Sequence, residues 1–419
     1  MRSRKLSRKR LCYRAGTVPG SDSADRSFSG VTAEEALRRA RALVPVLRER
    51  GAAAEALREM PKETLEDLHR TGLLRFHQPR RWGGMELPFV AVFDLPAEIA
   101  RGCASTAWNI GNLGIHHWML ALYDERAQHE VWGSNPDALI ASGIAYPQGR
   151  ARRVDDGFVI SGFWNFSSGV DPAEWNMLAT IVRDGERVVD HRMCLVPRSD
   201  YEIVDDWHVL GMRSTGSKSV KATDVFVPEH RALSMYLARG GSDFPGARVN
   251  PNPLYRVPLS GLGSHCLAGA GVGNPQAALE QTIDAIKERS TSYTAMRMRD
   301  FQAVQLRVAR AGAQIDAGRL MIRGDCVEAE RIAMEGRAPT IEEKLRFKRN
   351  VAYAMDLCTE AVDSLHALAG ANGLYDRYPI QRLFRDQHAL AAHIGFSWDA
   401  QGGPWALVTL GGEVSIPTL

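Results

Sequence analysis

Long hydrophobic runs are missing from this sequence. No uninterrupted apolar stretch reaches the roughly 18 residues that suggest a membrane-spanning helix, and the longest stretches are broken by Gly, His or Arg. Residues 1–30 also lack the apolar core of about 7–15 residues that is typical of a secretory signal. The sequence therefore predicts no membrane partner and a cytoplasmic location.

Cysteine is sparse as well. The six cysteines form no CxxC pair, and they are Cys12, Cys103, Cys194, Cys266, Cys326 and Cys358. Scattered single cysteines are typical neither of a disulfide framework nor of a zinc site. We therefore expect buried free thiols in a reducing compartment, and we predict no metal site.

Basic charge is in excess only at the N-terminus. Residues 1–30 hold eight of the 52 Lys and Arg residues and two of the 49 Asp and Glu residues, which leaves 44 basic against 47 acidic residues. A mildly acidic body is not expected to bind nucleic acid. Residues 1–30 are predicted to be a disordered basic arm, or the product of an upstream start codon.

The 419 residues are 45% hydrophobic and 24% charged, which suits a globular enzyme of two or three domains. Residues 31–135 have apolar side chains at helical spacing, and Thr32 with Glu35 forms a capping-box pattern at their start. Residues 136–250 contain short β-rich runs separated by turns and predict a β-barrel or sandwich. Residues 251–419 return to the helical period and predict a four-helix bundle. The fold class is therefore α+β.

Several motifs in this order resemble the acyl-CoA dehydrogenase family over about residues 31–419. The stretch "GFVISGFWNFSSGVDPAEWNML" is similar to the hairpin that sets an aromatic residue and a hydroxyl against the flavin ring, here Phe166 and Ser168. The stretch "GMRSTGSKSVKATDVFVPEH" resembles the strand pair that follows, and "LAGANGLYDRYPIQRLFRD" ends in the Arg-Asp pair of the family.

The sequence departs from the dehydrogenases at two places. The glutamate that abstracts the substrate proton would align with Ile394, and the arginine that holds the FAD pyrophosphate would align with Thr291. An isoleucine cannot act as a base, although Glu280 or Glu288 offers a displaced one. A dehydrogenase with a displaced glutamate therefore stays open as one alternative.

At both positions the sequence instead resembles a sister group, the oxygenase components of two-component flavin-dependent monooxygenases. This group includes enzymes similar to 4-hydroxyphenylacetate hydroxylase and to the seco-steroid phenol hydroxylases. The matching stretches are "GIHHW" with His116, "ASGIAYPQG" with Ser142, "WNFSSG" with Ser168 and "HIGFSWDAQG" with His393. The resemblance implies the same fold, a small aromatic substrate and a homotetramer that assembles through the C-terminal bundle.

The resemblance also implies the reaction. A separate reductase uses NAD(P)H and releases reduced flavin, FMNH2 or FADH2, which reacts with O2 to give a flavin C4a-hydroperoxide that hydroxylates a phenolic or polycyclic ring. Ser168 would oppose decay of this species near flavin N5. His393 would be the base that activates the phenol, because the pKa of free imidazole lies near 7. His116, rather than the adjacent His117, would orient the flavin or the substrate hydroxyl.

Further residues have both a functional and an ordinary structural interpretation. The flavin-binding candidates are Ser142, Phe166, Arg213, Ser214, Thr215 and Arg297, the last from a neighbouring subunit and next to Arg299. The substrate-pocket candidates are Trp118, Phe396 and Trp398. Turn formation, a solvated arginine pair, core packing and loop anchoring are the corresponding structural alternatives.

Two other functions remain open on the sequence. An oxygenase of this fold can act on an amine nitrogen or a sulfur, in which case a phenol base is unnecessary and His393→Ala would be mild. A non-enzymatic assembly partner would fail to bind reduced flavin.

Overall fold

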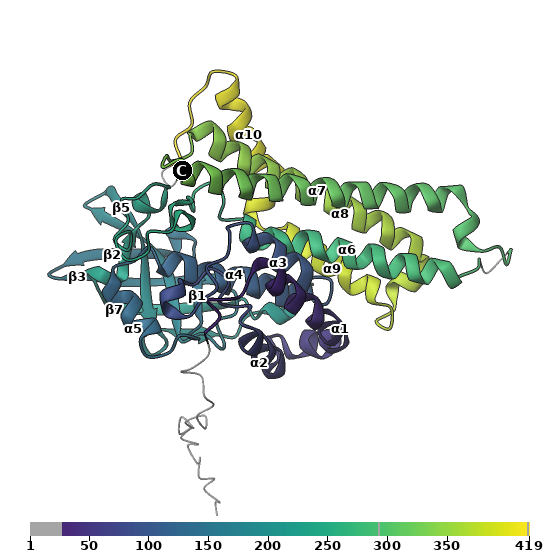
Figure 1. The fold of residues 1–419 in the computed structure, drawn as a ribbon, viewed down its shortest axis with the longest axis horizontal. Helices are drawn as coiled ribbons and strands as arrows, with labels where there is room; N and C mark the ends of the chain where they lie inside the picture. Colours follow the sequence, from purple (N-terminus) through teal and green to yellow (C-terminus); the bar gives the residue numbers. More distant parts are fainter. Residues whose placement is uncertain (1–26, 292–293, 417–418) are drawn as a thin grey trace, which may run out of the picture.

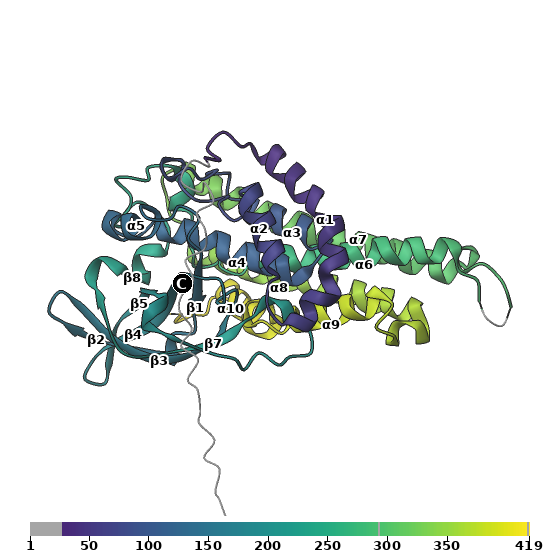
Figure 2. The ribbon, with the colours of Figure 1, turned by 90° about the horizontal axis from the view of Figure 1, so that it is seen from below.

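The computed structural model describes residues 27–291, 294–416 and 419. Most of the predicted basic arm, residues 1–26, lies outside the described residues. The chain forms helices, then a β-sheet, then helices again, as Figures 1 and 2 show. This order confirms the predicted α+β fold class. No helix in the described part of the chain combines the length and hydropathy that a membrane crossing requires.

From residue 27, where the described residues begin, the N-terminal region has five α-helices: α1 (Ala33–Leu57), α2 (Lys62–Thr71), α3 (Ala91–Ile99), α4 (Ala104–Leu120) and α5 (Glu125–Trp132). The predicted N-cap of α1 is confirmed, because the Thr32 hydroxyl accepts a hydrogen bond from the Glu35 amide at 3.2 Å. The reciprocal half of the capping box does not form, because the Glu35 carboxylate binds Arg38 and Arg39 instead. Helix α4 is buried along almost its whole length, since it packs against α3, the first strand and the first C-terminal helix. It is therefore the central helix around which the three regions meet.

Eight strands follow: β1 (Ile140–Gly143), β2 (Gly149–Val154), β3 (Gly157–Ser167), β4 (Trp175–Asp184), β5 (Arg187–Pro197), β6 (Glu202–Val204), β7 (Lys218–Pro228) and β8 (Ala232–Ser234). They belong to one mixed sheet in the order β6-β7-β3-β2-β4-β5-β8, and β1 pairs in parallel with β4. The strands predicted as a barrel or sandwich are thus hydrogen-bonded into a single sheet. The pairing of β3 with β7 shifts register between Trp164 and Ser167, where β3 ends.

The C-terminal region contains α6 (His265–Glu288), α7 (Gln302–Met334), α8 (Ile341–Ala369), α9 (Pro379–Ala391) and α10 (Trp398–Thr409). Helices α6, α7, α8 and α9 pack together, and α10 lies against α8. The distal parts of α6 and α7, with the described residues between them (289–291 and 294–301), project away from the other regions in Figure 1, and we call them the arm. The one-turn 3-10 helix η11 (Ile394–Phe396) joins α9 to α10.

One continuous hydrophobic core runs through all three regions. Helix α6 approaches α3 closely because it carries glycine at the contact. A Cβ atom at Gly273 would lie 2.1 Å from the Ala97 carbonyl oxygen, so a larger residue there would push the helices apart. The close packing of α6 holds the C-terminal helices against α3 and α4, and the aromatic side chains at η11 contact Trp108 of α4.

Candidate active site

One face of α4 presents three polar side chains to the sheet domain. Trp108, Asn112 and His116 are spaced four residues apart, so they lie above one another on the helix. The Trp108 indole donates to Ser168 Oγ at 3.1 Å, and Asn112 Nδ2 donates to the Ser168 carbonyl oxygen at 3.2 Å. His116 Nδ1 donates to the Ile140 carbonyl oxygen at 2.6 Å. These contacts fix the sheet domain on α4.

The turn after β3 positions Ser168. The Ser168 amide donates to the Phe166 carbonyl oxygen at 3.0 Å, and the Gly169 amide donates to the Thr215 carbonyl oxygen at 2.9 Å. Gly169 has a φ of +69°, and a Cβ atom there would lie 3.1 Å from the Leu113 side chain, so glycine suits both the turn and the close approach to α4. Ser168 is buried as a result.

His393 follows α9 and begins the turn η11. Its Nδ1 accepts a hydrogen bond from the Gly395 amide at 3.1 Å, which caps this turn. The ring centroid lies 5.7 Å from that of Trp108 and 5.5 Å from that of Phe396, and Phe396 also makes an edge contact with Trp108 at 6.4 Å. His393, Phe396, Trp108 and Ser168 therefore form one cluster drawn from all three regions of the chain.

The position of η11 depends on Gly395. A Cβ atom at this position would lie 1.9 Å from the Ser264 hydroxyl oxygen, directly before α6. Any larger residue would displace the turn, and with it the imidazole of His393. The start of α6 therefore holds the histidine in place.

Hydrogen bonding fixes the tautomers of the two predicted histidines. Burial lowers the pKa of both His393 and His116 to about 4, so both rings are neutral at pH 7. His393 accepts at Nδ1, so its proton sits on Nε2 and that nitrogen is a donor. His116 donates from Nδ1, so its Nε2 is an acceptor. The pKa of His393 in the structure, about 4, is thus lower than the value near 7 that we expected. The sequence does not reveal how deeply the ring is buried.

The adjacent His117 faces a different part of the molecule. Its Nδ1 accepts from the Trp132 indole at 3.0 Å, and the two rings stack with centroids 5.9 Å apart. Burial lowers the pKa of His117 to about 3. The structure therefore brings His116 to the sheet domain and leaves His117 in the N-terminal core.

The other predicted residues are divided between the cluster and distant places. Ser142 is buried on β1, the strand whose Ile140 binds His116, and its hydroxyl makes no hydrogen bond within the described chain. Phe166 lies two residues before Ser168 and is 70% exposed, with a φ of +64° that is rare for a bulky residue. Thr215 and Ser214 are buried beside the same turn. Arg213 instead turns outward, where its Nε donates to the Val209 carbonyl oxygen at 2.8 Å.

Three predicted residues lie outside the cluster. Trp118 is fully buried and its indole donates to the Leu254 carbonyl oxygen at 2.9 Å, so it anchors the core. Trp398 is 45% exposed at the start of α10, where it contacts Tyr353. Arg297 is exposed on the arm, beyond the far end of α6 from the cluster. The 24 residues of α6 span about 36 Å, so Arg297 cannot reach the cluster of its own chain.

The displaced-glutamate alternative finds no support in the geometry. Glu280 forms an ion pair with Arg101 at 2.9 Å on the side of α6 that faces the N-terminal helices. Glu288 is exposed at the end of α6 on the arm, and Ile394 is 66% exposed. Neither glutamate contacts His393, Trp108 or Ser168.

Three residues of the site were not singled out in the sequence. Trp108 and Asn112 precede His116 by eight and four residues, so the helical period places them on the face that carries His116. Ser217, whose Oγ lies 2.7 Å from Ser168 Oγ, has no comparable local signal. It reaches Ser168 only because β7 pairs with β3, which places Ser167 opposite Lys218.

The residues beside Ser168 fit a planar flavin ring. The exposed ring of Phe166 offers an aromatic face, and the free hydroxyl of Ser142 offers a hydrogen bond to a polar ring edge. Backbone strain of the kind seen at Phe166 costs about 1–3 kcal/mol and often marks a binding site. No group of three or more metal-ligating side chains occurs among the described residues.

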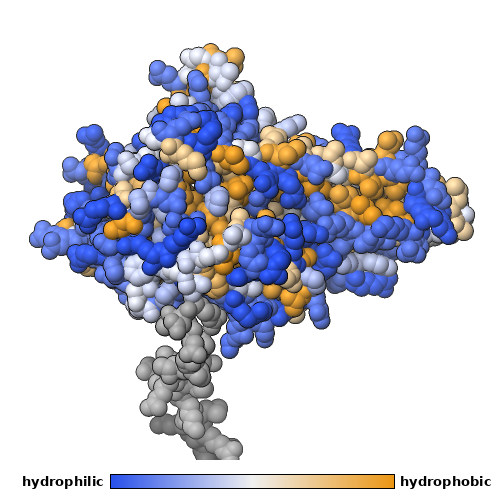
Figure 3. Space-filling model, viewed as in Figure 1, coloured by the Kyte–Doolittle hydropathy of each residue, from blue (hydrophilic) through white to orange (hydrophobic). Residues whose placement is uncertain are grey.

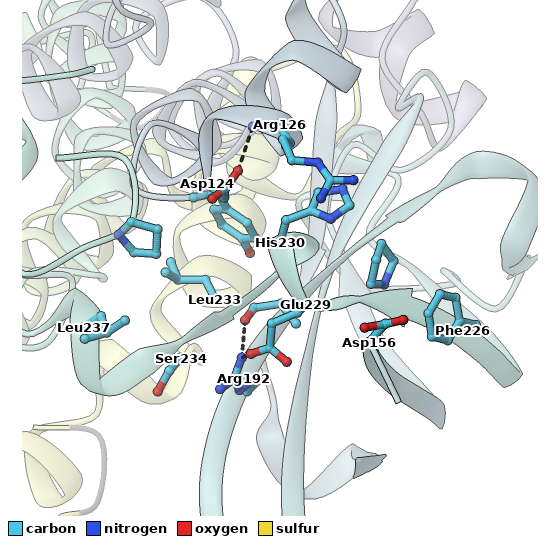
Figure 4. Close-up of a pocket in the computed structure, with 14 residues that line it drawn as sticks. Asp124, Arg126, Asp156, Arg192, Phe226, Glu229, His230, Leu233, Ser234 and Leu237 are labelled. Atoms are coloured by element: carbon cyan, nitrogen blue, oxygen red, sulfur yellow. Dashed lines mark hydrogen bonds and ion pairs between the residues drawn. The ribbon is translucent and has the colours of Figure 1, made fainter. Parts of the chain in front are cut away.

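A separate cavity of about 740 Å³ lies where β7 and β8 meet the start of α5, as Figure 4 shows. Two of its charged or titratable side chains already have partners, since Arg192 pairs with Glu229 at 2.6 Å and His230 pairs with Glu130, outside the lining, at 3.0 Å. Asp124 caps α5 through the Arg126 amide at 2.8 Å. None of the predicted site residues lines this cavity, so we do not assign the active site to it.

Comparison with known proteins identifies similar chains. Residues 33–134 match the acyl-CoA dehydrogenase N-terminal domain, and residues 265–398 match the acyl-CoA dehydrogenase C-terminal domain. The oxygenase subunit HsaA of a flavin-dependent monooxygenase from Rhodococcus jostii (strain RHA1) is 34% identical over 359 residues, which cover 85% of this chain and 93% of that protein.

Two further proteins show the same similarity. The oxygenase component of an FADH(2)-dependent resorcinol hydroxylase from Rhizobium sp. (strain MTP-10005) is 36% identical over 360 residues, covering 83% of this chain and 87% of that protein. The crystal structure of the HsaA monooxygenase from M. tuberculosis has a TM-score of 0.87 and 32% sequence identity, covering 93% of this chain and 100% of that one.

Proposed function

The chain belongs to the oxygenase components of two-component flavin-dependent monooxygenases with the acyl-CoA dehydrogenase fold, and from this premise we propose that it hydroxylates a phenolic ring beside His393. It is a flavin-dependent aromatic hydroxylase that uses reduced flavin from a separate reductase. The observation that carries the phenolic assignment is the cluster of His393, Trp108 and Phe396 next to Ser168.

The cluster suits an aromatic substrate with a hydroxyl group. Trp108 and Phe396 are buried rings that pack against His393, and Nε2 of His393 is a hydrogen-bond donor beside them. A donor that binds the phenolate oxygen stabilises the anion, so it lowers the pKa of the bound phenol without itself taking the proton. His116 Nε2 is an acceptor, and it is available for a substrate hydroxyl or for the flavin.

Bound reduced flavin supplies the chemistry that activates O2 for transfer of one oxygen atom to the ring. In our proposal Ser168 Oγ accepts a hydrogen bond from the N5–H group of reduced flavin and so opposes loss of this proton. Ser142 and Phe166 contact the flavin ring. The buried indole of Trp108 and the buried ring of Phe396 exclude water from this side of the site. Ser214 and Thr215 border the same turn and stay candidates for the flavin edge.

A reconstitution experiment tests this function. The purified chain is supplied with chemically reduced FMN or FAD, O2 and a panel of phenols, and products are identified by mass spectrometry with isotopically heavy O2. We expect catechol-type products that carry one heavy oxygen atom. Turnover of an acyl-CoA with tightly bound FAD, and no product from any phenol, would contradict the proposal. An amine or sulfide panel run in parallel separates nitrogen and sulfur oxygenation from ring hydroxylation.

We also propose that the chain forms a homotetramer through its C-terminal helices. Five exposed apolar residues recur every seven positions along α7, namely Leu306, Ala313, Leu320, Val327 and Met334. A seven-residue apolar repeat is the pattern of a helix that packs against another helix. Figure 3 shows hydrophobic side chains gathered over the arm, which supports an interface between copies there.

We further propose a cytoplasmic location. The five cysteines of the described residues are all free thiols, which supports a reducing compartment.

A further inference from the structure

Three buried hydroxyl groups form a continuous chain behind the candidate active site. Ser168 Oγ lies 2.7 Å from Ser217 Oγ, and Ser217 Oγ lies 2.7 Å from Thr215 Oγ1. Thr215 Oγ1 in turn donates to the Met212 carbonyl oxygen at 2.9 Å. All three hydroxyl residues are at most 6% exposed, so solvent does not compete for these hydrogen bonds.

The carbonyl group at the end of this chain sets the direction of every proton in it. A carbonyl oxygen can only accept, so the single hydroxyl proton of Thr215 is donated to the Met212 carbonyl oxygen. Ser217 must then donate to Thr215, and Ser168 must donate to Ser217.

Ser168 is left with acceptor capacity alone. Its proton points to Ser217, and one of its two lone pairs accepts from the Trp108 indole at 3.1 Å. The remaining lone pair can accept one more hydrogen bond, and no proton remains to be donated. A ligand beside Ser168 is therefore favoured if it presents an N–H or O–H group and disfavoured if it presents a bare acceptor.

We propose that Ser217 is a positioning residue that makes the site select the reduced flavin over the oxidised flavin. The inference rests on the proposed function, in which flavin N5 lies against Ser168. N5 carries a hydrogen in reduced flavin and is a bare acceptor in oxidised flavin. An enzyme that takes its flavin from solution needs this preference, since both forms are present when the reductase works.

Flavin titrations of the Ser217→Ala variant test the proposal. Without Ser217 Oγ, the Ser168 proton is free to turn toward N5 of oxidised flavin. We expect Kd for oxidised FMN or FAD, measured by the change in flavin absorbance, to fall about tenfold, which is the worth of one hydrogen bond. Kd for reduced flavin, measured anaerobically, should stay constant or rise.

Two further variants guard against a folding artefact. Thr215→Val keeps the side-chain shape and removes the hydroxyl that receives the Ser217 proton, so it should shift the same ratio of dissociation constants. Ser217→Thr keeps the hydroxyl and should restore the wild-type ratio. Thermal unfolding of each variant shows whether it is folded before the titration.

Ser219→Ala is the matched control, two residues farther along the chain at the start of β7. Ser219 is also buried, and its hydroxyl donates to Asp206 at 2.6 Å instead of joining the chain to Ser168. Its loss should leave the ratio of the two dissociation constants unchanged. If Ser217→Ala and Thr215→Val are folded but keep the wild-type ratio, the inference is wrong while the proposed function stands. A wild-type chain that binds neither form of flavin would overturn both.

Discussion

At the scale of single residues, the two histidines of the site differ in what they can do for a substrate. Both are neutral because burial lowers their pKa to about 4, yet His393 presents a donor at Nε2 and His116 presents an acceptor. The difference arises from one backbone contact each, an amide at Gly395 and a carbonyl at Ile140. The backbone, not the imidazole itself, assigns the role.

Substitution of His393 distinguishes a donor from a base. His393→Ala should lower the rate of phenol hydroxylation about 10–100-fold, which corresponds to the loss of one hydrogen bond to a charged oxygen. His393→Gln keeps an N–H donor and should retain more activity. Because the pKa of His393 is about 4, the ring stays neutral above pH 5 and the wild-type rate should show no step near pH 6.5. A step at that pH that disappears in His393→Ala would show that this residue accepts the proton.

The sequence alone brings out part of this site for clear physical reasons. His393, Ser168 and Phe396 stand in short motifs, so a local match is enough to single them out. The tautomer of His393 depends on the turn at Gly395 and on its packing against Ser264, which no local pattern reveals. The role of Ser217 depends on pairing between strands that are separated by about 50 residues of chain.

At the scale of elements, α9 is tied to the turn before β7 by one buried carboxylate. Asp386 on α9 accepts a hydrogen bond from the Met212 amide at 2.6 Å. Its neighbour Arg385 donates to the Leu210 carbonyl oxygen at 2.8 Å and pairs with Glu55 of α1. Thus α1, α9 and the turn that carries Thr215 are fixed as one unit. The hydroxyl chain ends on Met212, so this contact also supports Ser168.

The Asp386 contact makes stability depend on pH in a defined direction. Burial raises the pKa of Asp386 from 3.8 to about 6, so the folded state favours the protonated acid. The free energy of unfolding should therefore fall by up to about 3 kcal/mol, on account of this group, as pH rises from 4 through 6. Asp386→Asn keeps an oxygen for the Met212 amide without the charge. It should raise the thermal-unfolding midpoint at pH 7, with the gain vanishing near pH 4.

Asp386→Ala serves as the control for this prediction. It removes the acceptor and leaves the buried Met212 amide without a partner, which costs about 1–3 kcal/mol at pH 4. At pH 7 the loss of the buried charge offsets this cost, so Asp386→Ala should be less stable than Asp386→Asn at both pH values. If Asp386→Asn is less stable than wild type at pH 7, attraction from Arg382 outweighs the cost of burial.

A sequence pattern predicts the order of helices and strands but not how distant strands pair. The helical period gave the α–β–α order because period and turn residues are local signals. The arrangement of strands as one sheet is set by pairing between distant segments, so the alternation pattern left a barrel or sandwich open. Residues 251–264, before α6, fall within the predicted helical bundle of residues 251–419. They are mostly loop, because Pro251, Pro253 and Pro258 interrupt the amide donors that a helix requires.

At the scale of the whole molecule, the arm separates the flavin-binding candidates of one chain. Arg297 lies beyond the end of α6 that is far from Ser168, whereas the apolar repeat of α7 runs along the same arm. Arg297 is therefore far from the candidate site of its own chain. If copies pack through that repeat, we expect Arg297 of one copy to lie near the candidate site of another. We therefore propose that Arg297 binds the phosphate of a flavin held by a neighbouring copy, so this contact and the proposed tetramer form one structural hypothesis.

Loss of Arg297 should weaken flavin binding only when the flavin carries phosphate. Arg297→Ala should raise Kd for reduced FMN and reduced FAD about tenfold, because a charge-assisted hydrogen bond is lost, and leave Kd for reduced riboflavin unchanged.

Leu320→Lys places a charge in the exposed apolar repeat and should lower the fraction of oligomer measured by light scattering. That variant should lose the same phosphate-dependent part of the affinity, although Arg297 is intact. Lys287→Ala, an exposed cation on the same arm, should change neither. An equal effect of Arg297→Ala on riboflavin and on FMN would mean that the arginine supports the fold of the arm and does not contact phosphate.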